Sequence, residues 1–367
     1  MAKTQECRSP LPRAVAFAVA VAAVPALCGC TRPPATVVLS GATMGTVYTV
    51  KVVVKSSSRK SAAVDTASLV QQCLDDVNAK MSTYQEDSEL SRFNRFEEAS
   101  PFPVSSETAE VFEVAREVSD ATGGAFDVTV GPLVDAWGFG PPGRAESPPS
   151  DEELEALRAR VGYQMLEIDP AAGTLRKLRP DVHCDLSAVA KGYAVDCVAE
   201  RIEQQGFTDY MVEVGGEVRT GGLNAEGIPW RIAIEKPTPN VRSIESVVSL
   251  SGEAMATSGD YRNFVDVAGQ RYSHTMDPRT GRPVRHKLAS VSVIHKRCAV
   301  ADAFATGLMV LGPEEGPALA ERENLAALFL VHVGEGGFTR VATSAFEALT
   351  KDGAGRAART VPIEANQ

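Results

Sequence analysis

The sequence predicts an α+β protein with a mixed, largely antiparallel sheet, in which helices and two subdomains form a cleft. Segments with strand patterns and segments with helix patterns are interspersed along the chain. The second half is rich in predicted strands, and glycine-containing turns separate them. With 367 residues, the chain is long enough for one large or two medium domains with a hydrophobic core.

Two periodicities define the predicted elements. Alternating β-branched residues indicate strands, and apolar residues spaced three or four apart indicate helices. Glycine pairs and a Pro/Gly/Ser-rich segment mark the turns and an exposed loop. In chain order we expect a strand at 47–54, helices at 67–81 and 107–122, an exposed loop at 141–150, a helix at 151–160, strands at 210–214, 231–234 and 247–250, turns at 256–261 and 272–281, a strand at 289–294, a helix at 301–311 and a last strand at 327–333.

The most informative stretch covers residues 185–196, with the sequence Asp-Leu-Ser-Ala-Val-Ala-Lys-Gly-Tyr-Ala-Val-Asp. Small residues crowd its first half, which lets a ligand or another backbone approach closely. From Tyr193 onward the apolar residues follow helical spacing, so we expect a strand end, a tight turn and a helix start. Such a junction offers free backbone N–H groups and a favourable helix dipole to a phosphate. A helix entry held by a salt bridge of Asp185 with Lys191 is the alternative.

The N-terminus has the pattern of a targeting signal. Basic residues precede an almost wholly apolar run at 14–27, which is too short to span a bilayer comfortably. The run ends in Leu27-Cys28-Gly29-Cys30, which resembles a bacterial lipoprotein lipobox with Cys30 as the lipidated residue. We therefore expect a protein anchored by lipid to the periplasmic face of a membrane in the bacterial cell envelope; cleavage of an ordinary secretory signal is the alternative. The expected organisation is a lipoprotein signal peptide at 1–29, a tether at 30–39, one catalytic domain at 40–349 and a flexible tail at 350–367.

Charge and cysteine spacing exclude two classes of function. The formal net charge of −10 argues against a nucleic-acid partner, which would need a concentrated basic face. Beyond the signal region the cysteines are scattered, with no CxxC pair and no metal-ligand spacing. A disulfide is possible in an oxidising compartment, but no pairing can be deduced, and buried free thiols are the alternative. These cysteines are Cys73, Cys184, Cys197 and Cys298.

Eight short motifs occur in a defined order between about residues 40 and 315. Each is common by itself, but eight in order form a specific signal. They are Met44-Gly45-Thr46, the loop at 81–94, the segment at 124–127, the stretch at 185–196, Gly215-Gly216, the turn at 257–261, the turn at 274–281 and the helix start at 302–306. With these motifs the chain resembles the ApbE family, the FAD:protein FMN transferases.

The resemblance implies an Mg²⁺-dependent enzyme that takes FAD, releases AMP and attaches FMN through a phosphoester to a Thr or Ser of an acceptor protein. The acceptor would carry a motif resembling Ser/Thr-Gly-Ala-Thr and would be a membrane redox subunit. FAD would lie in the cleft between the two subdomains. Carried over residue by residue, the resemblance implies flavin contacts from Met44, Tyr84, Ala125, Phe126, Asp127, Asp185, Lys191 and Met276, and a metal site made by Asp302, the Thr306 hydroxyl and the backbone carbonyl of Ala188.

The implied metal site is chemically consistent. Asp302 and Thr306 lie four residues apart in a predicted helix, and hence on one face. Mg²⁺ prefers oxygen ligands and keeps places for water and substrate phosphates. The alternative for Thr306 is a hydrogen bond to its own helix backbone.

His274 is the only histidine inside a matching motif, and we expect it to act as general base because imidazole titrates near neutral pH. Asp277 would orient it or hold the turn.

The sequence leaves two other functions open. An FAD pyrophosphatase would use water in place of the protein hydroxyl and would release FMN and AMP. A flavin-binding lipoprotein without turnover would store flavin or transfer electrons, but flavin retention needs no Mg²⁺.

Ser40-Gly41-Ala42-Thr43 also fits the acceptor motif. We expect these four residues to lead into the first motif of the enzyme, with self-modification at Thr43 as the alternative.

Overall fold

The computed structural model describes residues 34–54, 59–143, 147–238, 243–259, 264–267, 270–334 and 337–353. The expected signal peptide and Cys30 lie outside these residues. The described residues belong to one compact unit. Within the described ranges, no helix has the length and apolar character needed to cross a membrane.

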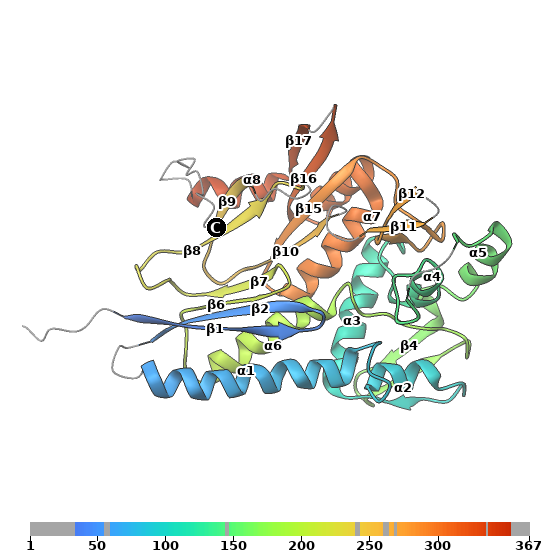
Figure 1. Cartoon of the computed structure of the whole chain (residues 1–367), viewed down its shortest axis with the longest axis horizontal. Coiled ribbons are helices and arrows are strands. Elements are labelled where there is room, and N and C mark those ends of the chain that lie inside the picture. The colour runs from blue at the N-terminus through green and yellow to red at the C-terminus, as the bar shows by residue number, and fades with distance from the viewer. Residues whose placement is uncertain are drawn as a thin grey trace, which may run out of the picture. The chain divides into compact units, whose positions relative to one another are not determined.

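An eight-stranded sheet runs through this unit (Figure 1). All its neighbouring strands pair antiparallel, so the α+β class is confirmed, and the described strand pairs include no parallel one. In order across the sheet, the strands are β1 (Ala35–Thr43), β2 (Thr46–Val54), β6 (Tyr210–Val214), β7 (Glu217–Gly221), β10 (Ala254–Gly259), β15 (Leu288–His295), β16 (Ala326–Val333) and β17 (Gly337–Ala342).

The sheet begins with a tight hairpin of β1 and β2. Met44 and Gly45 both have positive φ, 48° and 69°, as a two-residue turn between twisted strands requires. The predicted strand at 47–54 is therefore the second strand, and the predicted tether at 30–39 is wrong from Ala35 onward, where β1 begins. Thr43 is buried, and its hydroxyl accepts a hydrogen bond from Asn78 at 3.1 Å. Burial of this hydroxyl argues against self-modification at Thr43.

Helices cover one face of the sheet. α1 (Arg59–Met81) and α6 (Ala190–Gln204) pack against β1, β2 and β6, and α7 (Cys298–Arg322) packs against β10, β15 and β16. α1 lies along the β1–β2 hairpin in Figure 1. α3 (Ser106–Ala121) packs against α7. The apolar face of each helix is buried in this layer, which places the start of α6 beside the start of α7.

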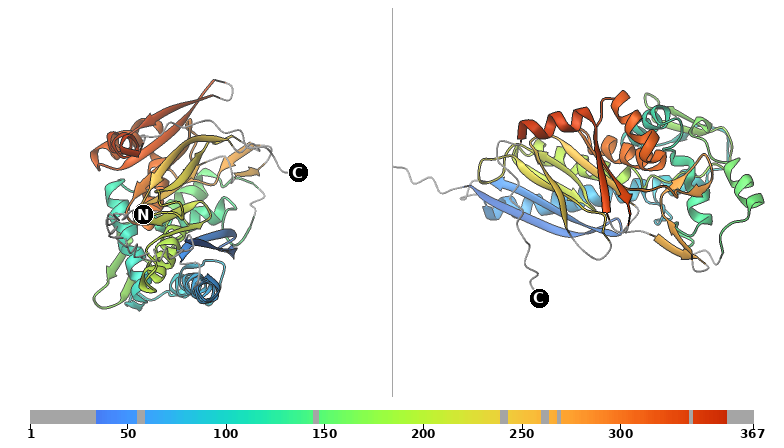
Figure 2. Two further views of the ribbon diagram at one scale, coloured as in Figure 1. Left: turned by 90° about the vertical axis from the view of Figure 1, so that its left-hand side faces the viewer. Right: turned by 90° about the horizontal axis from the view of Figure 1, so that it is seen from above.

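The opposite face of the sheet is covered by a two-stranded ribbon and a helix. β8 (Trp230–Glu235), β9 (Ile244–Leu250) and α8 (Ser344–Gly353) share a core cluster with Met211 and Met255 of the main sheet. The sequence neighbours of these two methionines face the helices, because successive strand residues point to opposite faces. The two views of Figure 2 show this layer beside the sheet.

Shorter elements build the remainder, partly against the main core cluster and partly around a small cluster of Leu133, Trp137, Leu154, Tyr272 and Met276. The Trp137 indole donates to the carbonyl of Gly281 at 2.9 Å, which ties two distant loops together. These elements are α2 (Glu89–Arg95), β3 (Phe102–Pro103), a 3-10 turn (Val128–Val130), α4 (Gly131–Ala136), α5 (Asp151–Arg158), a second 3-10 turn (Tyr163–Met165), β4 (Leu166–Asp169), β5 (Thr174–Lys177), β11 (Phe264–Val267), β12 (Gln270–Ser273), β13 (Met276–Asp277) and β14 (Arg282–Pro283).

Other predicted elements also differ from the structure. Residues 256–259 of the predicted turn belong to β10, and residues 260 and 261 lie outside the described ranges. β17 and α8 follow the strand that was expected to be the last one. α8 continues to Gly353, so the predicted flexible tail at 350–367 is helical where it begins.

A buried carboxylate joins α6 to α7. Asp196 accepts hydrogen bonds from the first two backbone N–H groups of α7, those of Cys298 and Ala299, both at 2.9 Å. Its side chain also pairs with Arg219 of β7 at 2.9 Å. Asp196 thus caps α7 and fixes the position of that helix relative to α6 and the sheet.

We expect Asp196→Ala to lower the free energy of unfolding by about 3–5 kcal/mol, because two helix N–H groups and the Arg219 guanidinium lose a buried partner. Glu200→Ala is the matched control, since Glu200 also contacts Arg219 but is 59% exposed, and we expect it to cost less than about 1 kcal/mol. Urea denaturation followed by circular dichroism measures both. Equal losses for the two variants would contradict the capping role.

Candidate active site

The matching motifs meet around one large cavity of about 960 Å³. Its walls come from the loop after α1, the start of α6, β7, β8, β10, the 274–278 turn and α7. A volume of this size suits a dinucleotide-sized ligand. Eleven of the twelve implied catalytic, flavin and metal residues line it: Tyr84, Ala125, Phe126, Asp127, Asp185, Ala188, Lys191, His274, Met276, Asp302 and Thr306.

Met44 is the implied site residue that does not line the cavity. It occupies the β1–β2 turn with a positive φ of 48° and packs against the main core cluster. The neighbouring Thr46 and Val47 do line the cavity. Met44 therefore shapes the hairpin beside the site, and this structure gives it no place in the cavity wall.

A half-buried lysine lies between two carboxylates in the cavity wall. The Lys191 ammonium is 3.2 Å from Glu217 of β7 and 3.5 Å from Asp302 of α7. Burial works against its charge, but Asp302 and Glu217 raise its pKa above the usual value. Burial raises the pKa of Asp302, opposed by Lys191 and by the N–H of Gly192. Lys191 does not pair with Asp185, so the helix-entry salt bridge considered from the sequence does not form.

Asp302 can reach the start of α6 because Gly192 has no side chain. A Cβ on Gly192 would lie 2.5 Å from the carbonyl oxygen of Cys298 and 2.8 Å from the Cβ of Asp302. At this close approach the N–H of Gly192 donates to Asp302 at 3.0 Å. Gly192 is the third residue of α6, and the N–H groups of a first helical turn have no acceptor within their own helix. Ala188 lies before the helix, and its carbonyl accepts no hydrogen bond from the described residues, which leaves it available to a ligand.

The oxygen atoms here fit a hard divalent cation. Asp302 offers a carboxylate, Ala188 a backbone carbonyl, and Thr306 a hydroxyl. The Thr306 hydroxyl lies 3.2 Å from the hydroxyl of Ser258 at the end of β10, so it faces across the cavity and not back along its own helix. Three oxygen ligands leave positions for water and phosphate oxygens around Mg²⁺. The described residues contain no cluster of three His, Cys, Asp or Glu side chains that could replace this set.

The cavity wall around Asp127 combines a buried turn with an exposed ring. Asp127 is buried, and its carboxylate accepts from the N–H groups of Thr129 and Tyr163 at 2.8 Å each. Burial raises the pKa of Asp127, while these hydrogen bonds oppose the shift. Phe126 is also buried, whereas Tyr84 is 69% exposed and can stack on a planar ligand. Asp185 is tied into this end by its N–H, which donates to Val128 at 2.7 Å.

His274 lies in the cavity wall next to Thr275 and Met276. The carboxylate of Asp277 pairs with Arg279 at 3.0 Å, and its carbonyl accepts the N–H of Gly281 at 2.8 Å. Of the two roles considered for Asp277, the structure places it in the second, holding the turn. This turn, tied by Gly281 to Trp137, presents His274 to the cavity.

The sequence did not indicate two parts of the site. Glu217 is 4% exposed, and its Oε2 atom has no hydrogen-bond partner among the described residues. It directly follows the recognised Gly215-Gly216 pair, which was the signal that could have pointed to it. Residues 232–235 of β8 also line the cavity. Among the described residues, six carboxylate side chains but only one Lys or Arg line it: Asp127, Asp185, Glu213, Glu217, Glu235 and Asp302, with Lys191.

The four cysteines are all free thiols in the structure. Cys184, next to Asp185, is fully buried, and burial raises the pKa of its thiol well above the usual range. A thiol held neutral in this way is a poor nucleophile. Buried free thiols were one of the two alternatives left open by the sequence.

Glu217 should make stability depend on pH. Burial raises its pKa in the folded protein to about 7 from an ordinary value of 4.5, against the opposing effect of Lys191. The folded state thus binds this proton more tightly than the unfolded chain, so the stabilisation is complete below pH 4.5 and is lost as pH rises through 7. We expect the metal-free protein to lose unfolding free energy over this range relative to Glu217→Gln, measured by urea denaturation. A difference in unfolding free energy between the two proteins that stays constant with pH would contradict this prediction.

Comparisons with known proteins agree with the geometry. The ApbE family model matches residues 44–329. The FAD:protein FMN transferase of Vibrio cholerae is 47% identical over 329 residues, covering 90% of this chain and 97% of the relative, and that of Escherichia coli K12 is 41% identical over 300 residues, covering 81% and 85%. The solved structure of flavin transferase ApbE from Vibrio cholerae aligns with a TM-score of 0.79 at 46% identity, over 86% of this chain and 100% of that one. The apo form of Pseudomonas stutzeri flavinyl transferase ApbE aligns with 0.78 at 41% identity, over 87% and 98%. The chain belongs to the ApbE family.

Proposed function

We propose that this chain transfers FMN from FAD to a Ser or Thr hydroxyl of an acceptor protein, with Mg²⁺, and releases AMP. Transfer of FMN from FAD to a protein is the activity that its relatives' names carry. One observation supports the Mg²⁺ dependence in this proposal. Oxygen atoms of Asp302, Thr306 and Ala188 line the same cavity as Lys191, and this cavity is large enough for FAD. A site for storing flavin alone would not need this arrangement.

The charge of the cavity explains a requirement for a cation. A pyrophosphate would enter a space lined by six carboxylates and one lysine, so it would be repelled without added positive charge. Asp302, Thr306 and the Ala188 carbonyl would hold Mg²⁺, which would supply charge neutralisation at the phosphates and at the AMP leaving group. Lys191 would contribute a second positive charge through its ammonium, which Glu217 keeps in place at 3.2 Å.

The flavin would lie toward Tyr84 and Phe126, and the pyrophosphate toward Lys191. Tyr84 presents an exposed ring, and the Ala125–Asp127 turn is fixed by buried hydrogen bonds. The N-terminal end of α6 faces the cavity with its positive dipole end, which favours phosphate oxygens.

His274 would take the proton of the acceptor hydroxyl. The acceptor oxygen then bonds to the phosphorus of the FMN part, the bond from that phosphorus to the AMP oxygen breaks, and AMP leaves with the bonding electron pair. Water in place of the acceptor would give FMN and AMP, as in a pyrophosphatase, and the names of the relatives favour protein transfer.

The lipobox-like segment at Cys30 supports the further proposal of a lipid anchor at the periplasmic face of a membrane.

Asp302→Ala should abolish metal-dependent transfer, because it removes the only carboxylate in the proposed metal site. We expect Mg²⁺ binding in the presence of FAD to weaken by more than about 100-fold, since even the outer partners of metal ligands are worth about 10–100-fold. Isothermal titration calorimetry measures the binding, and intact mass of the acceptor measures transfer. Glu314→Ala changes an exposed carboxylate on the same helix and serves as the control. Transfer by Asp302→Ala at the wild-type rate would show that the metal assignment is wrong.

His274→Ala should lower the rate of FMN transfer by about 10²–10⁴, the usual worth of general acid–base catalysis. The dissociation constant for FAD should stay nearly unchanged, because the proposed role concerns the acceptor hydroxyl. Flavin fluorescence gives the affinity, and a stopped-time mass assay gives the rate. His332→Ala, on β16 and outside the cavity wall, is the control. If the His274 variant loses FAD affinity in proportion to its rate, His274 binds FAD and is not the base.

A further inference from the structure

β8 has one open edge. Among the described strands it pairs only with β9, in a two-stranded ribbon. Four consecutive residues of β8, Ile232 to Glu235, line the active-site cavity. Successive side chains of a strand point to opposite faces, so four in a row can border one cavity when the backbone edge itself faces it. The edge of β8 that β9 leaves open therefore borders the site.

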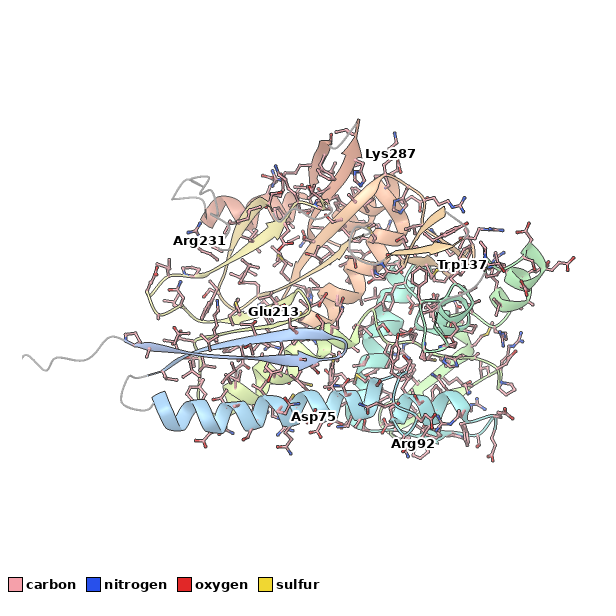
Figure 3. The ribbon with its side chains drawn as sticks, viewed as in Figure 1. Asp75, Arg92, Trp137, Glu213, Arg231 and Lys287 are labelled. Carbon is pink, nitrogen blue, oxygen red and sulfur yellow. The ribbon has the colours of Figure 1, made fainter. Side chains whose placement is uncertain are left out.

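The ribbon register identifies which backbone groups face the open edge. Just beyond β8, the N–H of Lys236 donates to Ser243 on the β9 side at 2.8 Å. Backbone groups alternate between the two edges along an antiparallel strand, so even-numbered residues of β8 face β9. Ala233 then directs its N–H and C=O to the open edge, while its side chain is exposed. Arg231, labelled in Figure 3, is also an odd-numbered residue of β8, so its backbone groups face the open edge as well.

The reaction requires a protein segment in this cavity. An acceptor hydroxyl has to reach the phosphate next to Lys191 and Asp302, and those two side chains line the same cavity as β8. An extended chain advances about 3.3 Å per residue and can reach inward from the surface without bringing a bulky fold with it. Exposed backbone groups on a strand edge hold such a segment in register without reading most of its side chains.

The chain contains an example of an acceptor-like sequence in this conformation. Ser40-Gly41-Ala42-Thr43 lies within β1 and pairs residue by residue with β2. Its Thr43 is buried, and the segment shows that these residue types fit a paired strand. On the cavity wall Val47, which is 63% exposed, offers an apolar contact for the small Gly-Ala part of such a motif.

We propose that the acceptor protein docks by adding an extended segment to the open edge of β8, with Ala233 supplying backbone hydrogen bonds, and so delivers its hydroxyl to the phosphate. This inference rests on the proposed transferase function and names the surface that selects the protein substrate. FAD occupies the Tyr84 and Lys191 side of the cavity and leaves this edge to the acceptor.

Ala233→Pro tests the edge, and Ala233→Val is its matched control. Proline removes the N–H at the open edge and is tolerated at edge positions, whereas valine adds bulk but keeps the N–H. The substrate is an acceptor domain carrying Ser-Gly-Ala-Thr, with transfer followed by intact mass. We expect the proline variant to raise the KM for the acceptor by about tenfold or more and the valine variant to raise it less, with the FAD dissociation constant unchanged in both. Equal KM values for the two variants would overturn the proposal.

Hydrogen exchange of the wild-type protein gives a readout without turnover. An acceptor domain whose target Thr is replaced by Ala should slow amide exchange in residues 230–235, and FAD alone should not. Protection by FAD alone would assign the edge to the nucleotide and overturn the docking proposal. Wild-type protein that binds FAD and Mg²⁺ but modifies no acceptor would instead contradict the proposed function, so the two failures are distinguishable.

Discussion

The close approach of α6 and α7 at Gly192 is the constraint on which the site depends. A side chain there would collide with the backbone of Cys298, so only glycine allows its N–H to reach Asp302 at 3.0 Å. That hydrogen bond holds the carboxylate of Asp302 at the start of α6. One missing Cβ thus positions the only carboxylate proposed for the metal site. Asp196, one helical turn further along α6, holds the start of α7 in the matching position.

Electrostatics gives this junction its selectivity. Lys191 is kept charged by Asp302 and Glu217, and Glu217 retains one buried oxygen without a partner. A cavity so rich in carboxylates does not suit a phosphate ligand by itself, because repulsion is strong where water is excluded. A divalent cation on Asp302 and the pyrophosphate it attracts complement each other. With the proposed metal, the acidic lining would couple nucleotide binding to the cation and disfavour phosphate ligands that arrive without one.

The sequence predicted which residues gather at the cavity better than it predicted the bounds of the strands. Motif residues such as Asp302 and Lys191 were found because ligand chemistry restricts which residue types serve and how they are spaced along a helix or a turn. Glu217 was missed because its significance lies in burial beside a lysine 26 positions earlier, which is tertiary information. β1 was missed because a short segment with few large apolar residues reads as a linker until its partner is known. The end of β10 was read as a turn because Thr257 and Ser258 have turn-like composition, and pairing with β15 overrides that preference.

The affinity of Gly192→Ala for Mg²⁺ in the presence of FAD tests the central claim most directly. Calorimetry on wild type and variant, with near-UV circular dichroism to confirm that the variant is folded, gives the comparison. A methyl group at this position must push Asp302 and the start of α7 away from α6, so the account predicts loss of measurable Mg²⁺ binding in a folded protein. A folded variant that binds Mg²⁺ as tightly as wild type would contradict the role given to the α6–α7 junction.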